Sequence, residues 1–245
     1  MKLISCNIEG DKHFQARLFP FFAKEQADIL VLQEVFEVDL EKIKQASGLR
    51  NCVFYPQANI ILPNIHLPLK GSWGVAIFAN EIIEEEGFYY CGHQHGQLAV
   101  FKNGHPELID RVALRAKVKV NEQLFQLVTV HFTWSGDATV TALQQRDYLI
   151  LRQFLESFEE IIFCGDLNTP RGGEIFDDLA KKYTDNIPLA VETTIDKNLH
   201  KSGKDIRLVV DSLFTSKEYV AEEVRVVPNT SDHMAVVAEI ERVSS

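Results

Sequence analysis

The sequence predicts an α/β fold with mixed sheets and helices on the outer faces of those sheets. Short apolar runs of strand type alternate along the chain with stretches whose apolar residues recur at helical spacing. Residues 111–120 alternate apolar with mostly basic side chains and turn at 121–122 into 124–132, which predicts a hairpin with one buried face. The long helical pattern over 139–158 has an apolar stripe, which a helix on the outer face of a sheet would bury against that sheet.

The first half of the chain alternates strand and helix signals. Apolar residues over 14–22 follow helical spacing, and Pro20 either kinks this helix or marks its start. A second helix over 38–47 is expected to end before Gly48. Residues 56–70 hold three prolines and no repeating pattern, which predicts a loop. Strands are predicted at 2–8, 28–35, 51–55, 73–79 and 82–91.

The second half of the chain continues this alternation. The helix over 139–158 is expected to place Leu143, Ile150, Phe154 and Phe158 on its core stripe. The remaining predicted elements are a strand at 161–167, a helix over 174–183 and strands at 208–215, 223–227 and 235–240.

Length and composition predict one globular domain over residues 1–245, because no Gly/Ser/Pro-rich linker or charge block divides the chain. The net charge of −10 disfavours a protein that coats nucleic acid or adsorbs to anionic membranes. It does not exclude a nuclease, since a local basic strip and a metal can hold one phosphate. No apolar run approaches the ~18 residues of a membrane span, so no membrane anchor is expected, and no obligatory protein partner is evident.

The four cysteines, Cys6, Cys52, Cys91 and Cys164, show neither pairing motifs nor zinc spacing. Three of them lie in apolar strand-like runs, where cysteine usually acts as a small buried hydrophobe. The apolar run at the N-terminus is too short for a signal peptide. We therefore expect a reduced, cytoplasmic setting.

Polar side chains close several of the apolar runs. Asn7 ends the first run, Glu34 ends the second, and Asp166 and Asn168 follow a strand-like run in the second half. Residues 231–233, Ser-Asp-His, open the last strand. Because polar groups at strand ends converge at one edge of a sheet, we expect these side chains to meet. A set of Asp, Glu, Asn and His is what a hard cation and a phosphate ester require.

The order of six such segments resembles the endonuclease/exonuclease/phosphatase superfamily, which includes deoxyribonucleases, abasic-site endonucleases, sphingomyelinases, deadenylases and inositol polyphosphate phosphatases. The resemblance runs from about residue 3 to residue 240. It implies a four-layer α/β sandwich, in which two central mixed β-sheets are flanked by helices and the site lies at one edge. The segments are Asn7, Leu32-Gln33-Glu34, Thr129-Val130-His131, Gly165-Asp166-Leu167-Asn168, Asp211 and Ser231-Asp232-His233.

Three of these residues are candidates for a metal site. Glu34 is the best candidate for a direct ligand, and the resemblance supports that role and places Asn7 and Asp232 close to the ion. Mg²⁺ is the expected cofactor, because it prefers oxygen ligands and keeps several waters, so that one or two carboxylates suffice. Mn²⁺ is the expected substitute.

Five further residues are candidates for the chemistry. His233 leads for polarising the attacking water or the phosphate, since the pKa of histidine lies near neutrality. Asp211 lies within an apolar run, where a charge is costly unless paired, and the resemblance pairs it with His233. The resemblance also implies that Asp166 aligns or deprotonates the water and that Asn168 hydrogen-bonds a phosphoryl oxygen. Whether Asp166 or His233 takes the proton stays open. By position, His131 resembles the family histidine that stabilises phosphoryl charge.

Three residues are candidates for substrate binding. Arg111 and Arg115 lie on the basic face of the 111–120 strand, which could track a nucleic-acid backbone. Lys117 and Lys119 on the same face are interpreted as a solvated surface. Trp134 directly follows the second strand of the predicted hairpin, where an aromatic ring can stack a base or pack an acyl chain.

The leading functional hypothesis is a Mg²⁺-dependent phosphodiesterase acting on nucleic acid or on a nucleotide-containing ester. The acidic charge, the apolar-rich 56–70 segment and His131 favour the alternative of a phospholipid or inositol-phosphate hydrolase, and abasic-site endonucleases carry Tyr where this chain has His131. A non-catalytic binding module would need a lost catalytic group, and none of the six segments has lost one. A zinc alternative rests on His93-Gln94-His95 with Cys91 and His66, a spacing that supplies only half a site.

Overall fold

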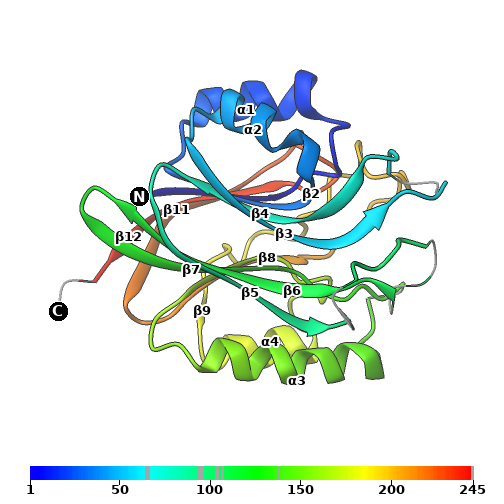
Figure 1. Cartoon of the computed structure of the whole chain (residues 1–245). Coiled ribbons are helices and arrows are strands. Elements are labelled where there is room, and N and C mark those ends of the chain that lie inside the picture. Colours follow the sequence, from blue (N-terminus) through cyan, green and yellow to red (C-terminus); the bar gives the residue numbers. More distant parts are fainter. Residues whose placement is uncertain (64–66, 93–96, 103–104, 106–107, 137, 244–245) are drawn as a thin grey trace.

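The structure, a computed structural model, describes residues 1–63, 67–92, 97–102, 105, 108–136 and 138–243. Two six-stranded sheets pack face to face, and helices cover the outer face of each sheet (Figure 1). Both sheets mix parallel and antiparallel pairs. The four-layer α/β sandwich predicted from the sequence is therefore confirmed.

The first sheet has the strand order β11-β12-β1-β2-β4-β3, and helices α1 and α2 lie on its outer face (Figure 1). A π-helical turn over Phe14–Leu18 precedes α1, and a 3-10 turn over Glu37–Asp39 precedes α2. Pro20 lies in the first turn of α1, so it marks the start of that helix. The elements are β1 Lys2–Asn7, α1 Phe19–Glu25, β2 Ile29–Phe36, α2 Leu40–Ser47, β3 Asn51–Ile60, β4 Gly71–Ala79, β11 Tyr219–Val227 and β12 Ala235–Arg242.

The second sheet has the strand order β5-β6-β7-β8-β10-β9, and helices α3 and α4 lie on its outer face (Figure 1). The β6–β7 hairpin pairs from Ala113 with Val130 to Val120 with Gln123, as its alternating pattern predicts. The elements are β5 Ile82–Cys91, β6 Arg111–Val120, β7 Gln123–His131, α3 Ala142–Glu156, β8 Ile162–Asp166, α4 Glu174–Ala180, β9 Thr184–Asp185 and β10 Asp211–Thr215.

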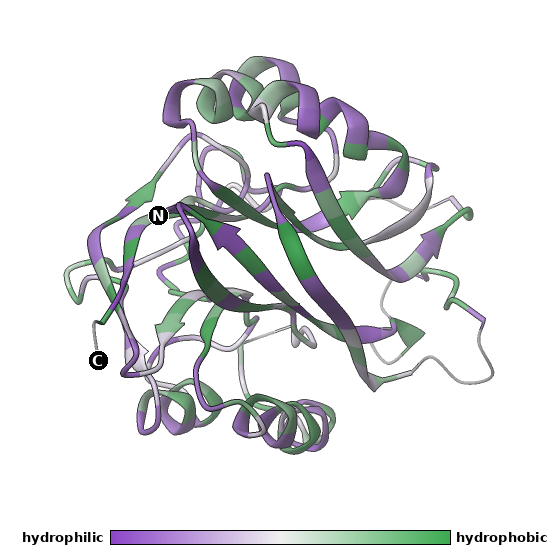
Figure 2. Cartoon of the chain, turned by 60° about the vertical axis from the view of Figure 1, so that its left-hand side comes forward, coloured by the Kyte–Doolittle hydropathy of each residue, from purple (hydrophilic) through white to green (hydrophobic). Residues whose placement is uncertain are grey.

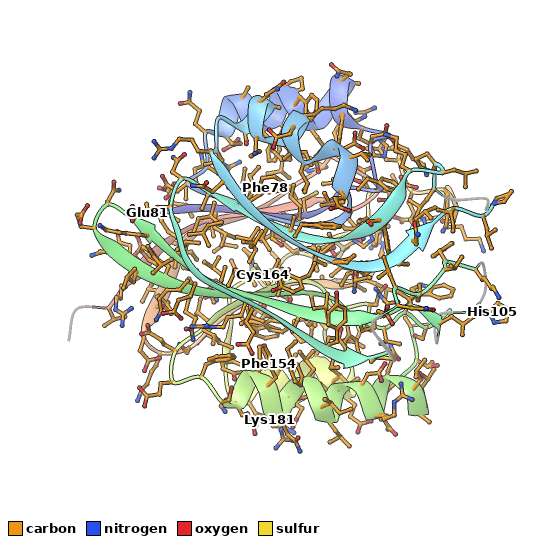
Figure 3. The ribbon with its side chains drawn as sticks, in the orientation of Figure 1. Phe78, Glu81, His105, Phe154, Cys164 and Lys181 are labelled. Atoms are coloured by element: carbon orange, nitrogen blue, oxygen red, sulfur yellow. The ribbon has the colours of Figure 1, made fainter. Side chains whose placement is uncertain are left out.

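Three apolar layers hold the sandwich together. Cys164 belongs to the cluster between the two sheets, Phe78 to the cluster under α1 and α2, and Phe154 to the cluster under α3 and α4 (Figure 3). Hydrophobic and hydrophilic residues alternate along several strands when the chain is coloured by hydropathy (Figure 2). The side chains between the sheets fix the separation of the two sheets, and this separation positions the edge residues described below.

Three predicted strands differ from the structure by three or more residues at one end, among them the strand predicted at 208–215, since β10 begins only at Asp211. β3 continues through Pro56 to Ile60, where a loop was expected. The register of β3 against β4 shifts between Pro56 and Ala58, and this bulge accommodates a proline in an edge strand. β11 starts at Tyr219 rather than at residue 223, because it pairs along most of β12.

The buried stripe of α3 also differs from the expected one. Phe154 is buried, but Ile150 is 37% exposed. Gln144 and Asp147 are fully buried instead, since both reach the strand end beyond β7 and bond to Thr133. Polar residues that find buried partners therefore rotate the helix away from its purely apolar stripe. No helix within the described ranges is long and apolar enough to cross a membrane.

The parallel pairs of the two sheets explain why polar residues meet at one edge. β1 and β2 are parallel with Asn7 opposite Gln33, and β7 and β8 are parallel with His131 opposite Asp166. Parallel strands end on the same side of their sheet, and the sheets are stacked with these ends on the same side. The carboxyl ends of four strands therefore deliver their polar residues to one place.

Replacing Gly165 by alanine is expected to lower the free energy of unfolding by about 3 kcal/mol. Gly165 has a φ of 136°, and an added Cβ would lie 2.3 Å from the carbonyl oxygen of Val130. Urea unfolding measures the loss. Gly48→Ala is the matched control, since Gly48 also has a positive φ, of 77°, but an added Cβ meets nothing within 4 Å. The control should cost about 1 kcal/mol, and equal losses in the two variants would contradict the close approach of β7 to Gly165.

Candidate active site

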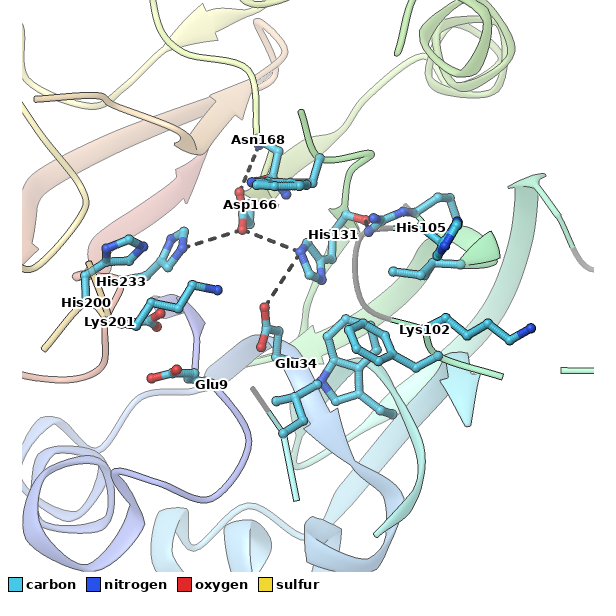
Figure 4. Close-up of a pocket in the computed structure, with 17 residues that line it drawn as sticks. Glu9, Glu34, Lys102, His105, His131, Asp166, Asn168, His200, Lys201 and His233 are labelled. Carbon is cyan, nitrogen blue, oxygen red and sulfur yellow. Dashed lines mark hydrogen bonds and ion pairs between the residues drawn. The ribbon is translucent and has the colours of Figure 1, made fainter. Parts of the chain in front are cut away.

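A cavity of about 410 Å³ opens at the edge of the sandwich where these four strands end (Figure 4). Eight residues predicted from the sequence line it directly, and they come from both sheets and from the segments that follow them. These residues are Glu34, Arg111, His131, Trp134, Asp166, Asn168, Asp232 and His233.

Glu34 reaches the cavity because β2 is bulged. The register of β2 against β4 shifts between Leu32 and Val35, and Glu34 has a positive φ of 59°. A bulge re-aims one side chain of a strand, here from the sheet face toward the cavity. Positive φ values also occur at Glu9 and Asn168, which line the cavity with Glu34.

Asn7 holds two carboxylates of the site together. Its Nδ2 donates to Oε1 of Glu34 and to Oδ2 of Asp166, both at 3.1 Å. Its Oδ1 accepts from the backbone N–H of Glu9 at 3.2 Å. Asn7 therefore joins the first sheet to the second across the site and fixes the spacing of the two carboxylates.

His233 and Asp211 form a hydrogen-bonded pair. Nδ1 of His233 lies 2.9 Å from Oδ2 and 3.1 Å from Oδ1 of Asp211, and both residues are buried. The other ring nitrogen of His233, Nε2, faces Asp166 with 3.8 Å between Nε2 and Oδ2 (Figure 4). The Asp211 carboxylate therefore sets the orientation of the ring, and Nε2 is presented to the cavity.

His131 faces Asp166 from the side opposite His233 and also lies near Glu34 (Figure 4). Its Nε2 lies 3.9 Å from Oε1 of Glu34 and 3.7 Å from Oδ2 of Asp166 (Figure 4). Its backbone carbonyl accepts from Nη1 of Arg111 at 2.9 Å and from Nε2 of Gln57 at 3.1 Å. These two buried side chains fix the end of β7, which carries the ring.

Asp166 and Asn168 are fixed by a tight turn after β8. The backbone N–H of Asn168 donates to Oδ1 of Asp166 at 2.9 Å, which leaves Oδ2 facing the two histidines. Nδ2 of Asn168 donates to the carbonyl of Phe132 at 3.1 Å, so one of its two amide hydrogens is used and the other remains available.

The protonation states follow from burial and from this crowding of charge. Burial, reinforced by Asp232, raises the pKa of Glu34 to about 7. Burial also raises the pKa of Asp166 to about 6. Burial lowers the pKa of His131 well below its usual value, and the charge of Arg111 adds to this effect. Burial alone would lower the pKa of His233, but the carboxylates of Asp211 and Asp166 outweigh it and raise that pKa well above its usual value.

These residues fit a divalent cation at Glu34. Glu34 is a partly buried carboxylate that shares the cavity with Asp166 and Asp232, and mutual repulsion of such groups is relieved by a bound cation. Ligand atoms of Asp166, Asp211 and His233 also lie within 4.8 Å of one another. We attribute that second proximity to the Asp211–His233 pair, since Nδ1 of His233 is already bonded to Asp211.

Of the three predicted substrate-binding residues, two line the cavity and one does not. Arg111 lines the cavity and is only 2% exposed, and no carboxylate of the described residues forms an ion pair with it. Trp134 lines the cavity and is 50% exposed. Arg115 does not line it, because its side chain packs over Phe158 and pairs with Glu84 on the outer face of the sheet. The prediction that Arg115 binds substrate is therefore not supported by its position.

Several residues that line or support the cavity were not found by sequence reasoning. Gln57 lies in the segment predicted as a loop, and Trp73 lies in the strand predicted at 73–79. The others lie in irregular segments with no motif of their own: Glu9, Leu67, Phe101, Lys102, His105, Ile109, His200 and Lys201. Of the zinc alternative, His66 and residues 93–95 lie outside the described residues.

Comparisons with known proteins place this fold and site in a family. Residues 4–233 match the model of the endonuclease/exonuclease/phosphatase family. A search of curated proteins finds no match.

Solved structures of low sequence identity share the fold over nearly the whole chain. An endonuclease/exonuclease/phosphatase of Bacteroides vulgatus is 16% identical, and the match covers 99% of this chain and 98% of that one with a TM-score of 0.71. A mannosyl-6-phosphatase of Bacteroides thetaiotaomicron is 16% identical, and the match covers 98% of this chain and 99% of that one with a TM-score of 0.70. TDP2 of D. rerio in complex with a single-strand DNA product is 15% identical, and the match covers 98% of each chain with a TM-score of 0.63.

These structural likenesses lie at low identity, so they support the fold, and the family match extends over nearly the whole chain. The chain therefore belongs to the endonuclease/exonuclease/phosphatase family.

Proposed function

We propose that the chain is a Mg²⁺-dependent phosphodiesterase that hydrolyses a phosphate ester in nucleic acid or in a nucleotide-containing substrate. The observation that carries this proposal is the convergence of Glu34, Asp166, His131 and the Asp211–His233 pair on one cavity. The proposal treats residues 1–245 as one catalytic domain, because the first sheet supplies Glu34 and the second supplies Asp166.

Glu34 would hold the metal directly, with Asp232 beside it, and Mn²⁺ would substitute for Mg²⁺. Asn7 would keep the Glu34 carboxylate aimed at the ion through its Nδ2 hydrogen bond. When bound, the ion supplies charge neutralisation at the non-bridging oxygens of the phosphate.

Asp166 is proposed to align the attacking water and to accept its proton. Its Oδ2 is the one carboxylate oxygen of the described residues that lies within 4 Å of both histidines, and its pKa of about 6 leaves it mostly ionised at neutral pH. His233 already carries a proton there, because its pKa is raised, so it pairs with a phosphoryl oxygen rather than acting as the base. The free amide hydrogen of Asn168 would bond a second phosphoryl oxygen.

His131 is proposed to contact the phosphate as a neutral ring, since its pKa is lowered. Nε2 of His131 faces the centre, and Arg111 behind it adds positive charge without touching solvent. A buried guanidinium that lacks a carboxylate partner in the described part of the chain favours an anion in the cavity.

Two observations bear on the substrate. The similar structure that holds a single-strand DNA product supports nucleic acid, and the similar mannosyl-6-phosphatase supports a small phosphate ester. The alternative, a phospholipid or inositol-phosphate hydrolase, is favoured by the exposed apolar side chains of Ile61, Leu62 and Leu69, which are close in sequence to the cavity-lining Leu67. A non-catalytic binding module is disfavoured, because none of the six sequence segments has lost the residue expected to act in catalysis.

A rate screen tests the proposal. DNA, RNA, sphingomyelin and inositol phosphates are offered in turn with Mg²⁺, with Mn²⁺ and with EDTA, and initial rates are compared. We expect cleavage that EDTA abolishes and that is fastest on a nucleic acid. A decisive preference for the lipid would contradict the nucleic-acid assignment, and no turnover of any ester would contradict the enzyme.

A further inference from the structure

One side of the cavity is lined by apolar residues and differs chemically from the acidic centre. We define the aromatic wall as Leu67, Trp73, Phe101 and Ile109, all of which line the cavity and belong to one apolar cluster. Leu67, Trp73 and Ile109 are buried, and Phe101 is partly buried. The catalytic chemistry proposed above uses none of these four side chains.

Backbone hydrogen bonds hold the aromatic wall in place. The segment that carries Phe101 connects β5 to β6 of the second sheet, but it pairs with β3 of the first sheet. The N–H of Asn59 donates to the carbonyl of Ala99 at 2.7 Å, and the N–H of Phe101 donates to the carbonyl of Asn59 at 3.1 Å. Oδ2 of Asp110 accepts from the N–H of Ala99 at 3.0 Å. Phe101 is therefore positioned by main-chain pairing between the two sheets.

The aromatic wall leads directly to the proposed reaction centre. The ring centroids of Phe101 and Trp73 lie 6.3 Å apart, and those of Trp73 and His131 lie 5.3 Å apart, each in an edge-to-face arrangement. His131 in turn lies within 4 Å of Glu34 and Asp166. A group that rests on the aromatic wall is thus close enough to belong to the same small molecule as a phosphate held at the centre.

We propose that the aromatic wall is a binding subsite for an aromatic ring carried by the phosphate ester. The substrate class is then a phosphate ester that carries a nucleobase or another aryl group, rather than the phosphate of a simple sugar that lacks such a ring. This inference rests on the proposed function and adds the group that the ester carries. Aromatic rings gain from edge-to-face packing against Trp73 and Phe101, whereas a sugar hydroxyl would find one hydrogen-bonding group among the four side chains of this wall, the indole N–H of Trp73, which has no partner among the described residues.

Two phosphonates that cannot be hydrolysed allow binding to the aromatic wall to be measured separately from catalysis. The full chain is titrated in a calorimeter, with Mg²⁺ present, with phenylphosphonate and with methylphosphonate, which differ only in the organic group. We expect phenylphosphonate to bind about tenfold more tightly. Phe101→Ala should bring the two affinities to within about twofold, because it removes a ring of the wall and leaves the acidic centre intact. Phe21→Ala, a partly buried phenylalanine on α1 that does not line the cavity, should keep the tenfold ratio.

Three outcomes would overturn the inference. The unmodified protein could bind phenylphosphonate and methylphosphonate with equal affinity, Phe101→Ala could leave the ratio of the two affinities unchanged, or neither phosphonate could bind. Tighter binding of n-hexylphosphonate than of phenylphosphonate would assign the wall to an alkyl chain and overturn it as well. If Phe101→Ala does not fold, Phe101→Leu keeps the apolar contact and should still lower the ratio. Turnover of bis(4-nitrophenyl) phosphate by the unmodified protein reports on the proposed function separately.

Discussion

Replacing Glu34 by glutamine is expected to lower the Mg²⁺-dependent rate of diester hydrolysis by about 10³-fold. The amide keeps the size of the side chain and can still accept a hydrogen bond from Asn7. It removes the negative charge that would hold the ion. Steady-state rates at saturating Mg²⁺, together with calorimetric titration of Mg²⁺, measure both losses.

The same substitution is expected to stabilise the metal-free protein at alkaline pH. The pKa of Glu34 is raised from 4.5 to about 7 in the folded chain, so ionising this carboxyl group costs more free energy in the folded state than in the unfolded state. This penalty is absent below pH 4.5, develops as the pH rises to about 7 and is complete above it. In EDTA at pH 8, Glu34→Gln should therefore unfold with a free energy about 3 kcal/mol higher than the unmodified protein.

Glu41→Gln on α2 is the matched control, because Glu41 is an exposed residue of a helix that lies away from the cavity. It should change neither the rate nor Mg²⁺ affinity. An unchanged rate in Glu34→Gln would show that Glu34 does not hold the ion. A loss of rate accompanied by a loss of stability in EDTA would show instead that Glu34 has a structural role.

Asp211→Asn is expected to lower the rate by about 10²–10³-fold through its effect on His233. Asp211 bonds Nδ1 of His233 and is the carboxylate that contributes most to its raised pKa. Without that charge the pKa of His233 falls, so the protonated form is lost at lower pH. The alkaline limb of the pH–rate profile should therefore move toward lower pH.

A histidine titration by NMR checks the cause directly, since the His233 signal should titrate at lower pH in Asp211→Asn than in the unmodified protein. Asp178→Asn on α4 removes a carboxylate that bonds Tyr148 and Arg152 far from the site, and it should leave the profile in place. A lower rate with an unmoved profile would mean that Asp211 supports the fold and does not tune His233.

The sequence was sufficient to predict the architecture and three residues that end strands, Asn7, His131 and Asp166, whereas Glu34 lies at a bulge inside β2. Asn7, Glu34, His131 and Asp166 each follow an apolar run, and the order of the motifs implied the family. Their convergence depends on two parallel pairs that end at the same edge, β1 with β2 and β7 with β8. The local sequence pattern predicts where each strand ends, and the parallel pairing of the strands brings these ends together.

The missed features depend on contacts between residues that are distant in the sequence. Gln57 is polar and follows Pro56, so it resembles a loop residue, yet it is buried because it bonds the carbonyl of His131 from the other sheet. The bonding of Gln144 to Thr133 turns α3 in the same way. Arg115 lies on the same face of β6 as Arg111, but it is four residues farther along the strand from the cavity, where it packs over Phe158. A partner that is remote in the chain leaves no periodic signal in the residue that it buries.

A divalent cation is expected to bind at Glu34 in this cavity. Anomalous diffraction from a crystal soaked in Mn²⁺ tests it most directly. We expect one strong peak about 2.1 Å from a carboxylate oxygen of Glu34, on the side of Asp232, with the Asp211–His233 hydrogen bond intact. A peak between Asp211 and His233, or no peak near Glu34 in crystals whose protein hydrolyses diesters with Mn²⁺, would contradict the claim.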